Sequence, residues 1–197
     1  MWNISQSPQV RDVAVPGVFH LTDFSERSLQ AFSKTLHRAH ENSQPLMPIF
    51  IQSDGGSAAI LFGFMSIMDC YREKGMQFAA VVSGTAASAG CCVFMYCDHR
   101  YMGKFSSLLF HSTQLGFEGN LQEARQVVEW HGKENDLMNE VLSKHLKKPK
   151  DWIKKQLKNN LLDDWLITSE KALELGIATS ISIPEFNLTL RSEFSIS

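Results

Sequence analysis

Two apolar runs, each followed by a loop of small residues and then by a helical pattern, constrain the fold more than any other feature of the sequence. The run 47–53 (MPIFIQS) leads into SDGGS, and residues 58–75 after it are apolar at almost every helical position. The run 77–84 (QFAAVVSG) leads through small residues into 88–97, a second apolar segment of helical length. Strand–helix units that repeat in this way predict an α/β fold with a mostly parallel sheet.

The same alternation continues on both sides of these units. Residues 17–21 (GVFHL) predict a short strand, and Asp23 stands three residues before Glu26, which is the spacing of a capping box at a helix start. That helix is expected to bury one apolar stripe, formed by Leu29, Phe32, Leu36 and Ala39. Beyond residue 97 we expect two short strands and a long helix, at 99–103, 107–112 and 121–146.

Length and composition favour one globular domain. The chain has 197 residues, of which 44% are hydrophobic and 20% charged, and its net charge is −2. This charge gives no bulk attraction to nucleic acid or to anionic membranes. No apolar run approaches the roughly 20 residues that span a bilayer, and the first ten residues do not resemble a signal peptide. We therefore expect a cytoplasmic protein without a nucleic-acid or membrane partner.

The cysteines favour reduced thiols over a metal site. None of the four belongs to a C-x-x-C pair, and three of them, Cys91, Cys92 and Cys97, lie in one apolar segment. Such a distribution is typical of buried thiols in a reducing compartment, and it lacks the spacing of zinc ligands. We expect no metal site.

The two loops are the candidate functional region. Loops that follow parallel strands lie at the same edge of a sheet, where ligands of α/β proteins collect. Backbone N–H groups of a glycine turn and of a helix start can hold the oxyanion that forms in acyl transfer. Ser88, at the start of the second helix, could attack a carbonyl if a base took its proton. Among the seven histidines, only His111 ends an apolar strand close behind this helix.

Taken singly, these residues have plainer explanations. Ser88 fits a helix N-cap, and His111 fits a strand-end histidine bonded to backbone. Asp164, in a later segment, fits a helix cap or a turn, and Gly55 and Gly56 fit a tight turn. Spacing alone does not decide between these explanations and a catalytic triad.

Four segments carry a resemblance to one family, and they occur in that family's order. They are SDGGS (53–57), SGTAASAG (83–90), LLFHSTQLGFEGNLQEA (108–124) and DDWLITSEKALELGIATSI (163–181). They are similar to the S-P-G-G loop, the G-x-A-A-S-M-G nucleophile motif, the I-H-Q-P-x-G-G-x-x-G-x-A stretch and the D-x-x-x-x-x-x-E-A-x-x-Y-G-L-I-D-x-I end of the Clp protease proteolytic subunit (ClpP) family. The resemblance spans roughly residues 17 to 183.

The resemblance implies a serine endopeptidase that cleaves peptides or unfolded proteins. Ser88 is then the nucleophile, His111 the general base, and Asp164, rather than Asp163, the residue that orients His111. The N–H groups of Gly56 and Ala89 form the oxyanion hole. No metal or organic cofactor is implied.

The resemblance also implies an architecture and an assembly. The fold is of the ClpP/crotonase type, with repeated β-β-α units and a protruding strand–helix handle at 114–146 that joins two stacked heptameric rings. We expect a short N-terminal segment at 1–16, one peptidase domain at 17–183 and a C-terminal tail at 184–197.

Two kinds of protein partner follow from the same resemblance, namely an AAA+ unfoldase and a related ClpP-like subunit. The sequence has no P-loop, so any ATP is used by a separate unfoldase. The 16 residues before Gly17 lack the family's usual N-terminal pattern. This terminus is either a trimmed, partly disordered segment or the sign of a less gated pore. In the second case we expect weak or absent docking of the usual unfoldase and cleavage of short peptides without ATP.

Several positions depart from the family pattern. Asp54 replaces the proline of the glycine loop, and Ala89 replaces the methionine after the serine. Ser112 and Thr113 replace the Gln-Pro pair after the histidine. None of these changes removes a triad residue, and together they predict an altered specificity or rate.

Two alternative functions remain open at the level of sequence. A crotonase-type acyl-CoA hydratase or isomerase has a related fold, and SGTAASAGCCVFMYCDHRYMG (83–103) is also similar to its strand, glycine-rich helix and CD-x-R segment. The chain could instead be an inactive structural subunit of a mixed protease ring.

Overall fold

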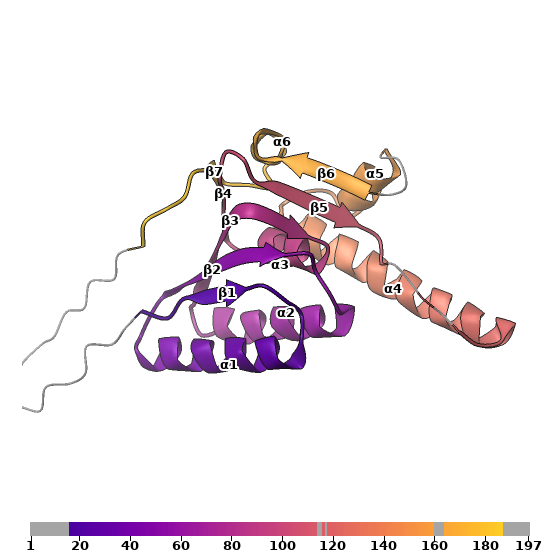
Figure 1. The fold of residues 1–197 in the computed structure, drawn as a ribbon, viewed down its shortest axis with the longest axis horizontal. Coiled ribbons are helices and arrows are strands. Elements are labelled where there is room, and N and C mark those ends of the chain that lie inside the picture. Colours follow the sequence, from indigo (N-terminus) through magenta and orange to yellow (C-terminus); the bar gives the residue numbers. More distant parts are fainter. Residues whose placement is uncertain (1–15, 114–115, 117, 160–163, 187–197) are drawn as a thin grey trace, which may run out of the picture.

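One sheet organises the protein (Figure 1). The computed structural model describes residues 16–113, 116, 118–159 and 164–186, and within them seven strands form a single sheet in the order β1-β2-β3-β4-β7, with β5 beside β3 and β6 beside β5. The strands are β1 (Phe19–Leu21), β2 (Leu46–Ser53), β3 (Gln77–Ala87), β4 (His99–Met102), β5 (Ser107–His111), β6 (Asp164–Thr168) and β7 (Ser180–Ile181). All strand pairs are parallel except β5–β6, so the predicted α/β fold with a mostly parallel sheet is confirmed.

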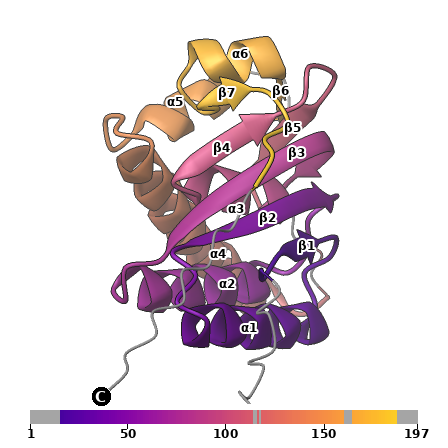
Figure 2. The same ribbon diagram turned by 90° about the vertical axis from the view of Figure 1, so that its left-hand side faces the viewer.

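Helices connect the strands and supply most of the remaining core. They are α1 (Glu26–Glu41), α2 (Ala58–Arg72), α3 (Ala89–Tyr96), α4 (Leu121–His145), α5 (Trp152–Lys158) and α6 (Ser169–Glu174). Figure 2 shows the strands stacked from β1 upward with α1 and α2 packed below them. Within the described residues, no helix is both long and apolar enough to cross a membrane.

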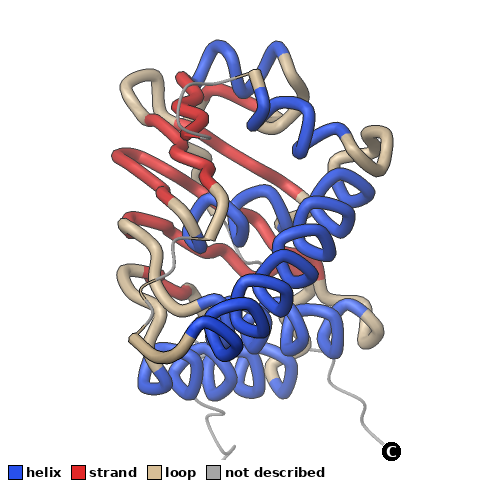
Figure 3. Tube along the Cα trace, turned by 90° about the vertical axis from the view of Figure 1, so that its right-hand side faces the viewer, coloured by secondary structure: helices blue, strands red, loops and turns tan. Residues whose placement is uncertain are grey.

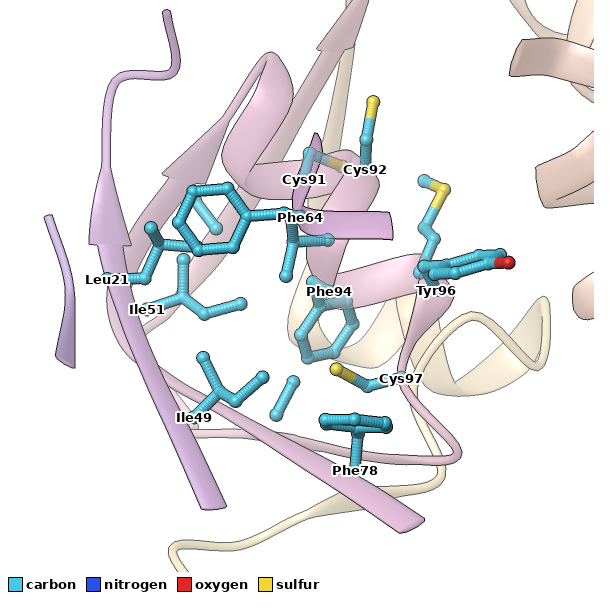
Figure 4. Close-up of a cluster of buried hydrophobic side chains, with 14 of the residues drawn as sticks. Leu21, Ile49, Ile51, Phe64, Phe78, Cys91, Cys92, Phe94, Tyr96 and Cys97 are labelled. Carbon is cyan, nitrogen blue, oxygen red and sulfur yellow. The ribbon is translucent and has the colours of Figure 1, made fainter. Parts of the chain in front are cut away.

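The core lies between the sheet and α1, α2 and α3. Phe32 is fully buried, and its ring centroid lies 4.9 Å from that of Phe19 and 4.8 Å from that of Phe64. Every residue of α3 is buried. Figure 4 shows side chains from β1, β2, β3, α2 and α3 converging on this core, among them Leu21, Ile49, Ile51, Phe64, Phe78 and Phe94.

The start of α1 differs from the sequence-based expectation. The N-cap is Ser25, not Asp23: the Ser25 hydroxyl accepts from the Ser28 N–H at 3.2 Å, and the Ser28 hydroxyl accepts from the Ser25 N–H at 3.0 Å. Both Asp and Ser cap helices well, so local spacing could not choose between two candidates two residues apart. The expected apolar stripe is confirmed, since Phe32, Leu36 and Ala39 are buried.

Helix α4 extends well beyond the rest of the fold (Figure 1). Figure 3, viewed from the side opposite to that of Figure 2, shows this helix crossing in front of the sheet. Asn120 caps its start, in a capping box with Glu123, and Gly132 does not interrupt it. Its second half packs into the core through Met138 and Leu142. The helical part of the predicted handle is thus present.

Some sequence-based expectations fall outside the described residues. These are the N-terminal segment 1–15, with the expected weak gating, much of the strand part of the handle (114, 115 and 117), Asp163, and residues 187–197 of the expected C-terminal tail.

Candidate active site

The glycine loop after β2 meets the end of β3 at one edge of the sheet. The second expected loop, SGTAAS (83–88), is not a loop: β3 continues to Ala87, and Ser88 alone separates this strand from α3. Strands β2 and β3 run parallel, and a shift in their register brings Ser53, the last residue of β2, opposite Ala86 near the end of β3. Gly55 has φ +101°, and a Cβ atom there would lie 2.5 Å from the Cβ atom of Ser88. The glycine loop therefore packs directly against the serine, and the space between them is too small for any side chain at residue 55.

Ser88 occupies a strained backbone conformation between β3 and α3. Its φ and ψ are 52° and −122°, which non-glycine residues adopt at a cost of roughly 1–3 kcal/mol. Its N–H donates to the carbonyl oxygen of Leu109 at 2.7 Å, which ties this turn to β5. Although Ser88 is at the N-cap position, its hydroxyl caps no backbone N–H of the described helix. The plain N-cap explanation is therefore wrong, and the half-buried hydroxyl has no structural use at the helix start.

His111 shares a cavity with the serine because β3 pairs with two strands. The first half of β3 pairs with β4, and its last residues, Thr85 to Ala87, pair with β5. Strand β5 therefore ends beside Ser88, and its final residue His111 lines the same cavity as the serine. The Nδ1 atom of His111 lies 2.7 Å from the carbonyl oxygen of Ser112. Because a carbonyl only accepts, Nδ1 carries a proton, and in the neutral ring Nε2 then holds the lone pair.

Asp164 is the first residue of β6 and lies directly opposite His111 in the antiparallel β5–β6 ladder. Directly opposite residues project to the same face, with Cβ atoms about 4.5–5.5 Å apart. Asp164 is therefore neither a helix cap nor a turn residue. Its side chain is exposed, and within the described structure the His111 ring bonds to Ser112 rather than to Asp164. The fold brings the two residues together without joining them by a hydrogen bond.

Gly56 and Ala89 flank the serine on two sides. Ala89 is the first residue of α3, a position whose N–H has no acceptor within the helix. Gly56 has φ +152° and is joined to Phe24 by an isolated parallel bridge. Both residues line the cavity that contains Ser88.

The cavity has a volume of about 440 Å³, and α4 forms the wall that sequence reasoning missed. The residues of α4 that line it are His131, Glu134, Asn135, Met138 and Asn139. They recur every three or four residues, so they share one helical face. This spacing was visible in the sequence, but nothing local to the helix showed which of its faces would meet the serine.

A thiol also lines the cavity, but it is not a second nucleophile. Cys92 stands one helical turn after Ser88 on α3 and is buried. Burial raises the pKa of Cys92 to about 12, which keeps the thiol protonated at neutral pH. Among the described residues, no group of three His, Cys, Asp or Glu side chains is arranged to hold a metal ion.

The close contact between residue 55 and Ser88 can be tested with a matched pair of substitutions. Gly55 and Gly75 both have positive φ, but a Cβ atom at Gly75 would meet nothing within 4 Å. Gly75→Ala should cost about 1 kcal/mol of backbone strain, whereas Gly55→Ala should cost more because the added methyl group also collides with the serine turn. Urea unfolding of both variants measures this difference, and equal losses would show that the loop can move away from Ser88.

The comparison with known families agrees with the geometry. The Clp protease family model matches residues 17–184, which includes both loops, β5, α4 and β6. The matched region covers most of the chain and all the residues described above. By this match the chain belongs to the Clp protease family, a family of peptidases with this α/β fold.

Proposed function

We propose that the protein is a serine endopeptidase in which Ser88, His111 and Asp164 form the catalytic triad. The observation that carries this proposal is the conformation of Ser88, a strained residue whose hydroxyl is free of capping and lies in a cavity shared with His111. Backbone strain of this kind persists where the surrounding structure enforces it, and it is common at active sites. The family match favours a peptidase over the acyl-CoA enzyme that a related fold can carry.

In the proposed mechanism Ser88 Oγ attacks the peptide carbonyl while His111 Nε2 takes its proton. The His111 tautomer supports this step, since Nδ1 holds the proton and Nε2 can accept. The N–H groups of Gly56 and Ala89 donate to the oxyanion of the tetrahedral intermediate. His111 then gives the proton to the leaving amine, and a water molecule activated by the same histidine hydrolyses the acyl-enzyme. No metal or organic cofactor takes part in these steps.

Asp164 acts in this mechanism only after a small rearrangement. The proton on His111 Nδ1 points to the Ser112 carbonyl, so rotation of the ring must transfer this hydrogen bond to the Asp164 carboxylate. The carboxylate then stabilises the imidazolium that forms when Ser88 is deprotonated.

Removal of the nucleophile should abolish hydrolysis and leave the fold intact. Ser88→Ala deletes one hydroxyl among small residues, so we expect a loss of roughly 10³-fold or more in kcat on a fluorogenic peptide. Ser83→Ala, at an exposed position of the same strand, is the control and should retain activity. A fluorophosphonate should label Ser88 in the native protein. Full activity of Ser88→Ala would contradict the mechanism, and native protein that neither cleaves nor labels would indicate an inactive ring subunit.

The position of Asp164 opposite His111 predicts unequal roles for two adjacent aspartates. Asp164→Asn should lower kcat by roughly 10²–10⁴-fold, because the neutral amide cannot stabilise the imidazolium. Asp163→Asn should have a small effect, since the family motif assigns the role to Asp164. Steady-state kinetics on one peptide compares the two variants. The reverse order would show that the assignment is shifted by one residue, although the serine mechanism would stand.

We also propose that α4 packs between subunits. Proteins of this family typically form oligomeric rings, and α4 exposes Leu121, Val128, Trp130 and Leu137. Together these side chains expose more apolar surface than a surface helix of a monomeric protein normally exposes to water. Two stacked heptameric rings, joined through α4, would cover them, and an unfoldase or a related ClpP-like subunit is the further partner that we propose.

Substitution on α4 tests this assembly. Light scattering of the native protein should give a mass many times that of one chain, and Trp130→Glu should lower it, because the charge would have to be buried in the contact. Phe105→Glu makes the same kind of change at an exposed residue away from α4 and should leave the mass unchanged. A monomeric native protein at micromolar concentration would overturn the proposed assembly.

A further inference from the structure

The wall of the active-site cavity on α4 carries polar groups that the triad does not use. His131, Glu134 and Asn135 lie on the face of α4 that lines the cavity. On the side of the glycine loop, Asp54 lines the same cavity. The cavity therefore contains two carboxylates besides the proposed catalytic groups, and no lysine or arginine is among the described residues that line it.

Glu134 and His131 form a partly buried pair with unfilled hydrogen-bonding capacity. Their Oε2 and Nδ1 atoms lie 2.7 Å apart, and the side chains are 24% and 29% exposed. These two atoms are shielded from solvent, so the exposed part of the Glu134 side chain lies on its other atoms. A carboxylate offers about four acceptor sites, and a group held out of water is stabilised when those sites are filled. Glu134 is thus able to bind a cation.

The α4 wall of the cavity is fixed relative to β5, the strand that ends in His111. The Oδ1 atom of Asn135 accepts from the N–H of Thr113 at 3.2 Å and from its hydroxyl at 2.8 Å. Thr113 follows His111 by two residues, so these bonds anchor the end of β5 to the helix that carries Glu134. A side chain bound at this wall would therefore be held in a constant position relative to the proposed base.

The rest of the lining suits a long side chain with a charged end. Leu61, Phe62, Phe110 and Met138 give the cavity apolar surface beside the two carboxylates. Lysine and arginine place their methylene stems against apolar surface and keep the charged head at a polar site. An acidic side chain would be repelled by the two carboxylates. A purely apolar side chain would displace water from the Glu134 carboxylate without donating a hydrogen bond in its place.

We propose that the α4 wall is a specificity subsite for lysine or arginine at the residue that donates the scissile carbonyl, and that Glu134 binds its charged end. This inference rests on the proposed serine peptidase function and adds the class of substrate. Glu134 is a specificity-determining residue, since it is not among the groups that we assign to the chemical steps.

The test compares peptides that differ at a single residue. Four fluorogenic peptides carry lysine, arginine, leucine or glutamate before the scissile bond, and kcat/KM is measured for each with the native protein. The kcat/KM values of the lysine and arginine peptides should exceed that of the leucine peptide by roughly tenfold or more. A hydrogen bond to a charged group increases affinity by about this factor. The glutamate peptide should be the poorest substrate.

Substitution of the carboxylate tests the named residue. Glu134→Gln keeps the shape of the side chain and removes its charge, so the ratio of lysine to leucine kcat/KM should fall by roughly 10- to 100-fold. Glu129→Gln is the matched control, because Glu129 is on the same helix, 70% exposed and paired with Lys133 outside the cavity. Its ratio should equal that of the native protein.

The outcomes separate this inference from the function on which it rests. If Ser88-dependent hydrolysis occurs but the native protein prefers leucine, or if Glu134→Gln keeps the native ratio, the subsite is wrong and the serine mechanism stands. If the native protein cleaves none of the peptides and Ser88 is not labelled by a fluorophosphonate, both proposals fail. The preference of the native protein is decisive even if Glu134→Gln does not fold.

Discussion

The contact between the glycine loop and Ser88 is the constraint on which the rest of the site depends. A Cβ atom at residue 55 would lie 2.5 Å from that of Ser88 and 3.1 Å from both the carbonyl oxygen of Ala87 and the amide nitrogen of Ala89. Such an approach requires β2 and β3 to be parallel neighbours that end together. It also holds Ser88 in its strained turn, so that the hydroxyl is free and the first N–H of α3 is left open.

The other proposed catalytic residues follow from how the sheet is continued. Strand β3 is long enough to pair with β4 along its first half and with β5 at its end. This second pairing brings His111 to the serine, and the antiparallel β5–β6 ladder then places Asp164 opposite His111. His111 and Asp164, which are far apart in the chain, are thus placed opposite each other by backbone pairing.

The proposed catalytic groups and the proposed specificity residue lie on opposite walls of the cavity. The proposed catalytic groups come from the ends of β3 and β5, from the start of β6 and from the two loops, whereas the opposite wall comes from α4. The bonds from Thr113 to Asn135 connect the two sides. Because α4 also extends away from the fold, as Figure 1 shows, one helix carries both the proposed specificity wall and the apolar surface proposed for assembly.

The sequence by itself determined the elements and their class, because the spacing of apolar residues is a local property. The strands, the buried α3, the stripe of α1 and the meeting of the ends of β2 and β3 were predictable in this way, and family motifs named Ser88, His111 and Asp164 as candidates. Local patterns could not choose Ser25 over Asp23 as the cap of α1, nor distinguish a capping serine at residue 88 from a strained one. Only the tertiary structure decided these points, and it alone placed His131 and Glu134 in the wall of the cavity that Ser88 lines. The face that a helix presents to a cavity is set by the packing of segments far apart in the chain.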